Sequence, residues 1–185
     1  MPDITLPIRT GRLILRRFKA ADLDAFHAYH SLPETVRFLP GEAKSYTKFM
    51  ESVGKYANFV FEKEGDWICL AIEAVDGPGL LGEVVLKWLP GSGQGEIGWS
   101  LAPAARGKGY GAEAADAVLR LGFDELGMHR IEAKLDVLNT ASAALCERLG
   151  MRLEARFIDK WHYKGQWATE LMYAILEDEW RARRR

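Results

Sequence analysis

Three glycines alternate with charged and aromatic residues in one short segment, Arg106-Gly107-Lys108-Gly109-Tyr110-Gly111. The segment joins a stretch with the alternation of a strand to a stretch with the periodicity of a helix. The first amides of a helix lack intrahelical partners and carry a partial positive charge, so they bind phosphate groups. Glycines let the backbone approach such an anion and adopt positive φ angles. With the charges of Arg106 and Lys108, the segment predicts a phosphate-binding turn.

The spacing of these glycines disfavours two common phosphate-binding motifs. A P-loop ends in Gly-Lys-Ser/Thr after a longer gap, which the segment lacks. The dinucleotide-binding fingerprint is Gly-x-Gly-x-x-Gly, and the third glycine comes too early here. A protein that binds ATP or NAD through another kind of phosphate nest stays an alternative.

The residues around the turn predict a strand, a helix and a second strand in that order. Residues 96–101 and 130–138 alternate between apolar and polar or small positions, whereas residues 111–126 have helical spacing. The two strands of such a unit are parallel and adjacent. The other predicted elements are a strand at 12–17, helices at 22–30 and 45–61, strands at 67–73 and 80–88, a helix between 139 and 150, and two strands between 151 and 176. This is the pattern of an α/β protein with a mixed sheet and helices on its faces.

Length and composition predict one soluble domain over residues 1–185. Hydrophobic residues make up 48% of the chain, enough for a sizeable core, and the formal net charge of −1 gives no drive toward nucleic acid or an anionic membrane. We see no signal peptide and no apolar run of membrane-spanning length, so we expect a cytoplasmic protein. Cys69 and Cys146 are expected to be buried thiols. His27 and His30 lack the partners of a metal site, and no metal is predicted.

The glycine turn resembles the Arg/Gln-x-x-Gly-x-Gly/Ala signature of the GCN5-related N-acetyltransferases. Downstream, Asn139-Thr-Ala-Ser142 followed by Leu149-Gly150 is similar to the Asn-x-x-Ser…Leu-Gly-Phe segment of that family. Residues 10–16, Met172-Tyr-Ala-Ile and Glu179-Trp180 resemble the subgroup of ribosomal-protein N-terminal acetyltransferases. The resemblance covers nearly the whole chain.

The resemblance implies a mostly antiparallel sheet of about seven strands, in which the parallel pair separates at one end. The implied co-substrate is acetyl-CoA. Its pantetheine arm would lie in the gap between the separated strands and pair with the backbone of Trp99, Ser100 and Leu101. Its pyrophosphate would bind the amides from Arg106 to Gly111.

The implied reaction moves the acetyl group of acetyl-CoA to a primary amine by direct attack in a ternary complex. Asn139 would hydrogen-bond the pantetheine arm, and Ser142 would lie near the thioester sulfur and protonate the leaving thiolate. The acceptor would be a protein N-terminus, a lysine, or a small molecule such as an aminoglycoside or a polyamine. We expect it to bind between the helices of residues 23–61 and the last hairpin. The resemblance also implies a homodimer.

A base must remove a proton from the attacking amine. Glu96 is the first candidate, because it begins the strand that would flank the acetyl group, and Glu83 on the preceding strand is the second. Each could instead be a solvent-facing residue of its strand. Since the pattern leaves the base open, two alternatives remain. One is a catalytically silent module that binds or senses CoA, and the other is a transferase that uses another acyl-CoA, such as succinyl-CoA.

Overall fold

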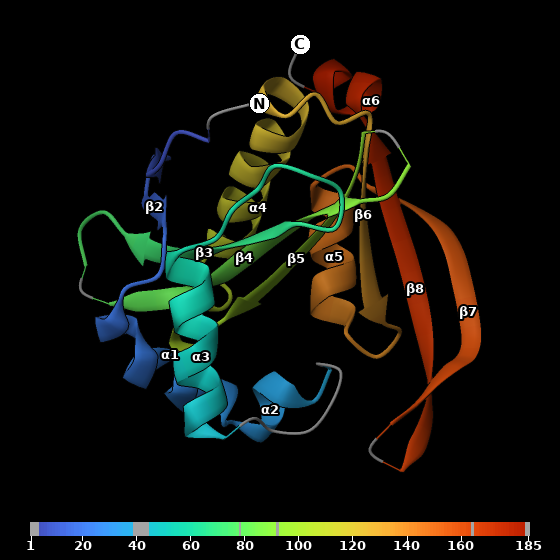
Figure 1. Cartoon of the computed structure of the whole chain (residues 1–185). Helices are drawn as coiled ribbons and strands as arrows, with labels where there is room; N and C mark the ends of the chain where they lie inside the picture. The colour runs from blue at the N-terminus through green and yellow to red at the C-terminus, as the bar shows by residue number, and fades with distance from the viewer. Residues whose placement is uncertain (1–3, 39–44, 78, 92, 164, 184–185) are drawn as a thin grey trace.

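An eight-stranded sheet forms the centre of the molecule, in the order β1-β2-β3-β4-β5-β6-β8-β7 (Figure 1). The computed structural model describes residues 4–38, 45–77, 79–91, 93–163 and 165–183. The strands are β1 (Ile8–Arg9), β2 (Leu13–Arg16), β3 (Trp67–Ala74), β4 (Leu80–Leu89), β5 (Gln94–Leu101), β6 (Arg130–Asp136), β7 (Arg152–Tyr163) and β8 (Gln166–Leu176). The prediction of about seven strands is therefore wrong by one, because the two-residue strand β1 adds to β2 at the edge of the sheet.

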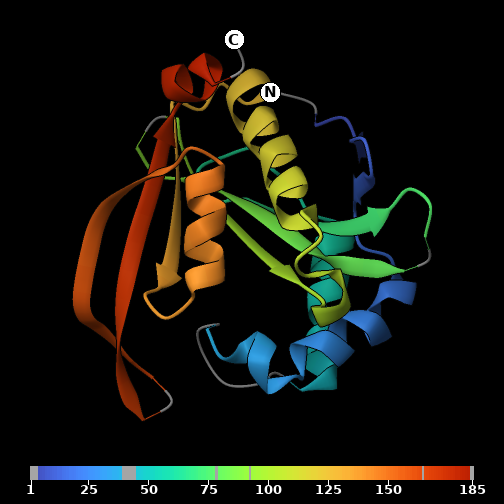
Figure 2. The same ribbon diagram turned by 180° about the vertical axis from the view of Figure 1, so that it is seen from behind.

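Helices cover both faces of this sheet. They are α1 (Leu23–His30), α2 (Pro33–Val36), α3 (Tyr46–Ala57), α4 (Tyr110–Arg120), α5 (Thr140–Arg148) and α6 (Glu177–Ala182). Figure 2 shows α4 and α5 in front of the strands and α3 behind them, and α1 packs with α3 in one hydrophobic cluster. Successive side chains of β3 point alternately toward the helices on the two faces of the sheet. Ile68, Leu70 and Ile72 are buried in the core with α4 and α5, whereas Cys69 and Ala71 are buried with α1 and α3.

Two short helices were not predicted from the sequence, and their local chemistry explains the difference. The sequence predicts that Pro33 ends the preceding helix, and α1 does end before it, at His30; Pro33 also starts α2, because proline fits the first position of a helix. Helix α6 begins after Leu176, whose amide donates to the carboxylate of Glu179 at 2.8 Å. The predicted helix at 45–61 ends earlier, at Ala57. The sequence also predicts a chain break at Pro40-Gly41, and these two residues lie outside the described ones.

Strands β5 and β6 are the parallel pair that the sequence predicts, and their pairing is short. Its register covers Gln94 with Arg130 through Glu96 with Glu132, and the described residues form no further pair beyond it. After Glu96, β5 continues beside β4 up to Leu101, while β6 continues beside β8. The two strands diverge toward their carboxyl ends, as Figures 1 and 2 show. The expected separation of the parallel pair is confirmed.

Candidate active site

The glycine turn follows the separated end of β5 and opens α4. A short 3-10 turn (Pro103–Ala105) comes first, and Gly107 and Gly109 then have φ angles of 73° and 80°. Only glycine adopts this left-handed conformation without strain, which explains both positions. Gly109 is the N-cap of α4, so the amides after it lie at the positive end of an eleven-residue helix. The predicted turn geometry is thus present.

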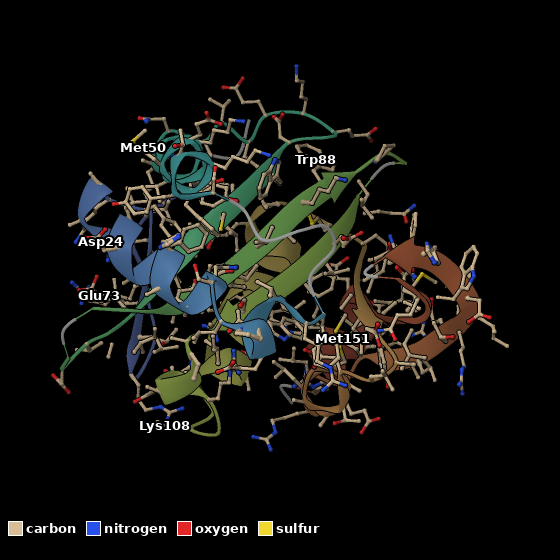
Figure 3. All side chains as sticks on the ribbon, turned by 90° about the horizontal axis from the view of Figure 1, so that it is seen from below. Asp24, Met50, Glu73, Trp88, Lys108 and Met151 are labelled. Atoms are coloured by element: carbon tan, nitrogen blue, oxygen red, sulfur yellow. The ribbon has the colours of Figure 1, made fainter. Side chains whose placement is uncertain are left out.

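The side chain of Arg106 does not point along this turn. Its Nε donates to the carbonyl oxygen of Leu101 at 3.0 Å, and its Nη2 donates to Oγ1 of Thr35 in α2 at 2.7 Å. Its amide donates to the carbonyl of Pro103. Arg106 therefore ties the end of β5 to α2, a role that the sequence did not suggest. Figure 3 shows α2 and the turn carrying Lys108 at the same end of the molecule.

Arg12, which sequence reasoning missed, holds the turn from the other side. Its Nη1 donates to the carbonyl of Lys108 at 2.9 Å, its Nε is 2.7 Å from Oε2 of Glu113 in α4, and its guanidinium stacks over the ring of Tyr110. Glu113 also accepts from the amide of Arg12 at 2.8 Å and from Oγ1 of Thr10 at 2.6 Å. Burial raises the pKa of Glu113, but these bonds from Thr10 and Arg12 outweigh it and leave the pKa lowered.

Ser142 and Trp99 meet across the gap between β5 and α5. The indole Nε1 of Trp99 donates to Oγ of Ser142 at 3.3 Å. Oδ1 of Asn139 accepts from the amide of Ser142 at 3.1 Å and caps α5. Since Oγ of Ser142 accepts from the indole, the hydroxyl hydrogen stays available to a further acceptor. The structure thus brings together three residues that the sequence singled out.

Glu96 lies at the closed end of the gap. It pairs with Glu132 in the last parallel register, and its Oε2 is 2.8 Å from Nζ of Lys134. The same Nζ is 2.7 Å from Oε1 of Glu132. The carboxylate of Glu96 is therefore held by a cation where β5 and β6 still pair, and not at the separated ends of the strands.

Glu83 is placed differently. The residue is 7% exposed, and its partners in β3 and β5 are Ala71 and Ser100. Tyr29 donates its hydroxyl hydrogen to Oε2 of Glu83, and Nε2 of His30 lies 2.8 Å from Oε1. Burial raises the pKa of Glu83 well above its ordinary value. The expectation that Glu83 could be a solvent-facing strand residue is thus wrong, because α1 covers it.

Among the residues that the structure describes, no cluster of His, Cys, Asp and Glu side chains could hold a metal ion. None of the described helices is long and apolar enough to cross a membrane. Cys69 and Cys146 are buried thiols outside any disulfide, as expected, and burial raises the pKa of Cys146 to about 12.

The chain belongs to the GNAT acetyltransferases. The model of the GNAT acetyltransferase domain matches residues 12–152. The chain is 35% identical to the uncharacterized N-acetyltransferase YnaD of Bacillus subtilis over 94% of its own length and 98% of that protein. It is 31% identical to a solved GNAT acetyltransferase from Bacillus anthracis, with a TM-score of 0.84, covering 94% of this chain and 99% of that one.

A more distant structure shares the fold and carries ligands. The spermidine N-acetyltransferase of Vibrio cholerae, solved with CoA and spermine, has a TM-score of 0.78 at 20% identity, covering 92% of this chain and 99% of that chain. At this identity the likeness shows the fold alone. Family membership makes this chain an acyltransferase enzyme of the N-acetyltransferase type.

Proposed function

We propose that this enzyme transfers the acetyl group of acetyl-CoA to a primary amine by direct attack in a ternary complex. The observation that carries the proposal is the separation of β5 from β6 after Glu96, directly before the glycine turn that opens α4. A gap of this kind gives an extended thioester arm free backbone to pair with, and the helix N-terminus beside it suits a pyrophosphate.

The donor site consists of two connected parts. The backbone of Trp99, Ser100 and Leu101, along the edge of β5 that faces the gap, would pair with the pantetheine arm, and Asn139 would bond it from α5. The pyrophosphate would bind the turn of residues 106–111, with Lys108 at its rim. The contacts of Arg12 with Lys108 and Glu113 support the turn in this shape.

The transfer itself needs orientation more than covalent chemistry, because a thioester is already activated. An amide on the free edge of β5 would polarise the thioester carbonyl. Ser142, aligned by Trp99, would donate its hydroxyl hydrogen to the leaving thiolate. Glu96 was the first candidate for the base, and its ion pair with Lys134 at the closed end of the gap makes the role less favourable.

The acceptor would approach from the face of the sheet that α1 and α3 cover. The acceptor class stays a primary amine: a protein N-terminus, a lysine or a small molecule. The Vibrio cholerae relative was solved with a polyamine, and polyamines are therefore one sensible class to test. The resemblance to the ribosomal-protein N-terminal acetyltransferases makes peptide N-termini another.

Calorimetric titration of acetyl-CoA tests the donor site. Gly107→Asp and Gly109→Asp would each place a carboxylate where the pyrophosphate should bind, and we expect both to abolish micromolar binding. Gly65→Asp is a matched control, because Gly65 also has a positive φ of 94° and open space where a Cβ would lie, but it bonds Trp88 at the end of β4 and is not part of the turn. It should bind like the wild type. Absence of binding by folded wild-type protein would refute the proposal.

Turnover would then be measured as thiol release with spermidine, an alanyl peptide, a lysine amide and an aminoglycoside. We expect acetyl-CoA to be consumed with at least one of these amines. Succinyl-CoA in place of acetyl-CoA tests the alternative acyl donor. Binding of acetyl-CoA without turnover by any amine would favour the silent CoA-binding module instead.

A further inference from the structure

We propose that Glu83 and His30 together take up the proton that the acceptor amine releases, and that Tyr29 is a positioning residue for Glu83. The proposal rests on the proposed function and assigns the base that the sequence left open. It replaces Glu96, the first candidate, with a pair of residues that lie 53 positions apart in the chain.

The position of Glu83 in the sheet is the first argument. Its neighbour in β5 is Ser100, four residues beyond the last pair that β5 forms with β6. Glu83 therefore lies beside the free part of β5, where the thioester would be held. Its side chain is on the face that α1 covers, opposite to α4 and α5, which is the face from which the acceptor would come.

The neutral surroundings of Glu83 are the second argument. The described residues include no lysine or arginine within ion-pair distance of its carboxylate. The other deeply placed carboxylate on this face, Asp22, is instead bound by Arg16 at 2.7 Å. Burying a carboxylate without a cation is unfavourable for folding. Such a group next to a reaction centre is a candidate for acid–base work.

The contact between Glu83 and His30 explains how the pair could hold one proton. With Oε1 and Nε2 only 2.8 Å apart, a single proton can be shared between carboxylate and imidazole, and the titration belongs to the pair. Burial favours uptake by raising the pKa of Glu83. Titratable or charged groups come to this face from every neighbouring element. They are Arg16 of β2, Asp22 before α1, Tyr29 and His30 of α1, Cys69 and Glu73 of β3, Lys87 of β4, Glu96 of β5 and Arg106 after β5.

The transfer step balances with this assignment. The nitrogen of the neutral amine forms a bond to the carbonyl carbon as the carbon–sulfur bond breaks, and the electron pair leaves with sulfur. Ser142 gives a proton to the thiolate, while the Glu83–His30 pair receives the proton lost by nitrogen, directly or through one water molecule. Exchange with solvent then returns a proton to Ser142 and removes one from the pair.

The decisive experiment compares Glu83→Gln with Glu96→Gln in the amine panel. Glutamine keeps the size of the side chain and can still bond Tyr29 and His30. We expect Glu83→Gln to bind acetyl-CoA like the wild type, to lose about 10²- to 10⁴-fold in kcat, and to lose the acidic limb of the pH profile of kcat/KM. Glu73→Gln, a carboxylate on the same face held by Arg16, should keep the wild-type profile.

Tyr29→Phe tests the positioning role of Tyr29 through the pH profile, which would not change if Tyr29 only supported the fold. The hydroxyl of Tyr29 stabilises the ionised carboxylate, so its loss should move the acidic limb to higher pH. A wild-type kcat and pH profile in Glu83→Gln, with loss of activity in Glu96→Gln, would overturn the proposal while leaving the proposed function intact. Failure of the wild type to bind acetyl-CoA would instead refute the proposed function.

An NMR titration of the His30 imidazole needs no acceptor. In the wild type we expect the ionisation of His30 to be coupled to that of Glu83. Glu83→Gln should then change the proton concentration at the midpoint of the His30 titration by about tenfold or more. An unchanged midpoint would show that the two groups do not share a proton, and would overturn the assignment whether or not an amine is found.

Discussion

Replacing Glu113 by alanine should loosen the glycine turn and destabilise the protein together. The carboxylate of Glu113 accepts hydrogen bonds from Oγ1 of Thr10 and from the amide and Nε of Arg12. The bonds from Thr10 Oγ1 and from the Arg12 amide each contribute roughly 1 kcal/mol, and the bond from Arg12 Nε is counted as the ion pair. The ion pair with Arg12 adds only about 0.5 kcal/mol, because the Arg12 side chain is 53% exposed. Its place in the first turn of α4 adds about 0.5 kcal/mol more.

The sum of these contributions predicts a loss of about 3 kcal/mol in the free energy of unfolding. For a chain of this size that corresponds to a fall of about 6–12 °C in Tm. Asp116→Ala is the matched control on the same helix, because its partner Arg120 is 4.0 Å away and both side chains are exposed. It should cost no more than about 0.5 kcal/mol.

The pH dependence of the Glu113 contribution has a definite sign. Because the folded pKa of Glu113 is lowered, its stabilisation is fully present above the ordinary value of 4.5 and is lost as the pH falls through the folded value. Urea unfolding of wild type and Glu113→Ala should therefore differ most at neutral pH and converge below pH 4.5. Equal stability of Glu113→Ala and Asp116→Ala at neutral pH would refute the reasoning.

Three further changes have equally direct outcomes. In Gly82→Ala the new Cβ would lie 2.3 Å from the carbonyl oxygen of Ser100, so both the stability of the fold and the affinity for acetyl-CoA should fall. Gly54→Ala is the control, because a Cβ there meets open space, and it should be neutral or stabilising in the same unfolding and binding assays. Trp99→Phe removes the hydrogen bond to Ser142 and should lower kcat by about 2- to 12-fold at unchanged acetyl-CoA affinity. Trp88→Phe removes an indole N–H that finds no hydrogen-bond partner among the described residues, and it should leave kcat unchanged. Equal rates in the two variants would argue against a role for the Trp99 bond. Cys146, buried with its pKa raised to about 12, should resist alkylation at pH 8 in the native protein and react only in urea, and rapid native labelling would contradict its burial.

The sequence predicted the elements whose signals are local. Residues 130–138 alternate strictly, and the strand appears at Arg130–Asp136. The glycines at 107 and 109 fall at positive φ angles, because a turn that leads straight into a helix needs that backbone. The strand β1 is only two residues long, and its pairing depends on β2 rather than on a pattern of its own, so no periodicity could reveal it.

The contacts that the sequence did not reveal connect segments far apart in the chain. Arg12 reaches Lys108 and Glu113 across about a hundred residues, and Arg106 reaches Thr35 across 71. An arginine in a polar stretch looks like any solvated side chain until its partner is placed. The glycine turn could be found from its own residues, whereas the side chains that hold it could not.

The choice of a base shows the same limit from the side of function. Glu96 was the first candidate because it begins the strand that would flank the acetyl group. The register places Glu96 where β5 and β6 still pair, next to a lysine, and places Glu83 beside Ser100 where the strands have separated. An antiparallel neighbour can lie nearer to a reaction centre than a residue of the same strand. The partners that bury Glu83 come from α1, whose apolar stripe gave no sign that Tyr29 and His30 would meet a carboxylate. A base assigned from sequence therefore needs the strand register before its position relative to the thioester can be judged.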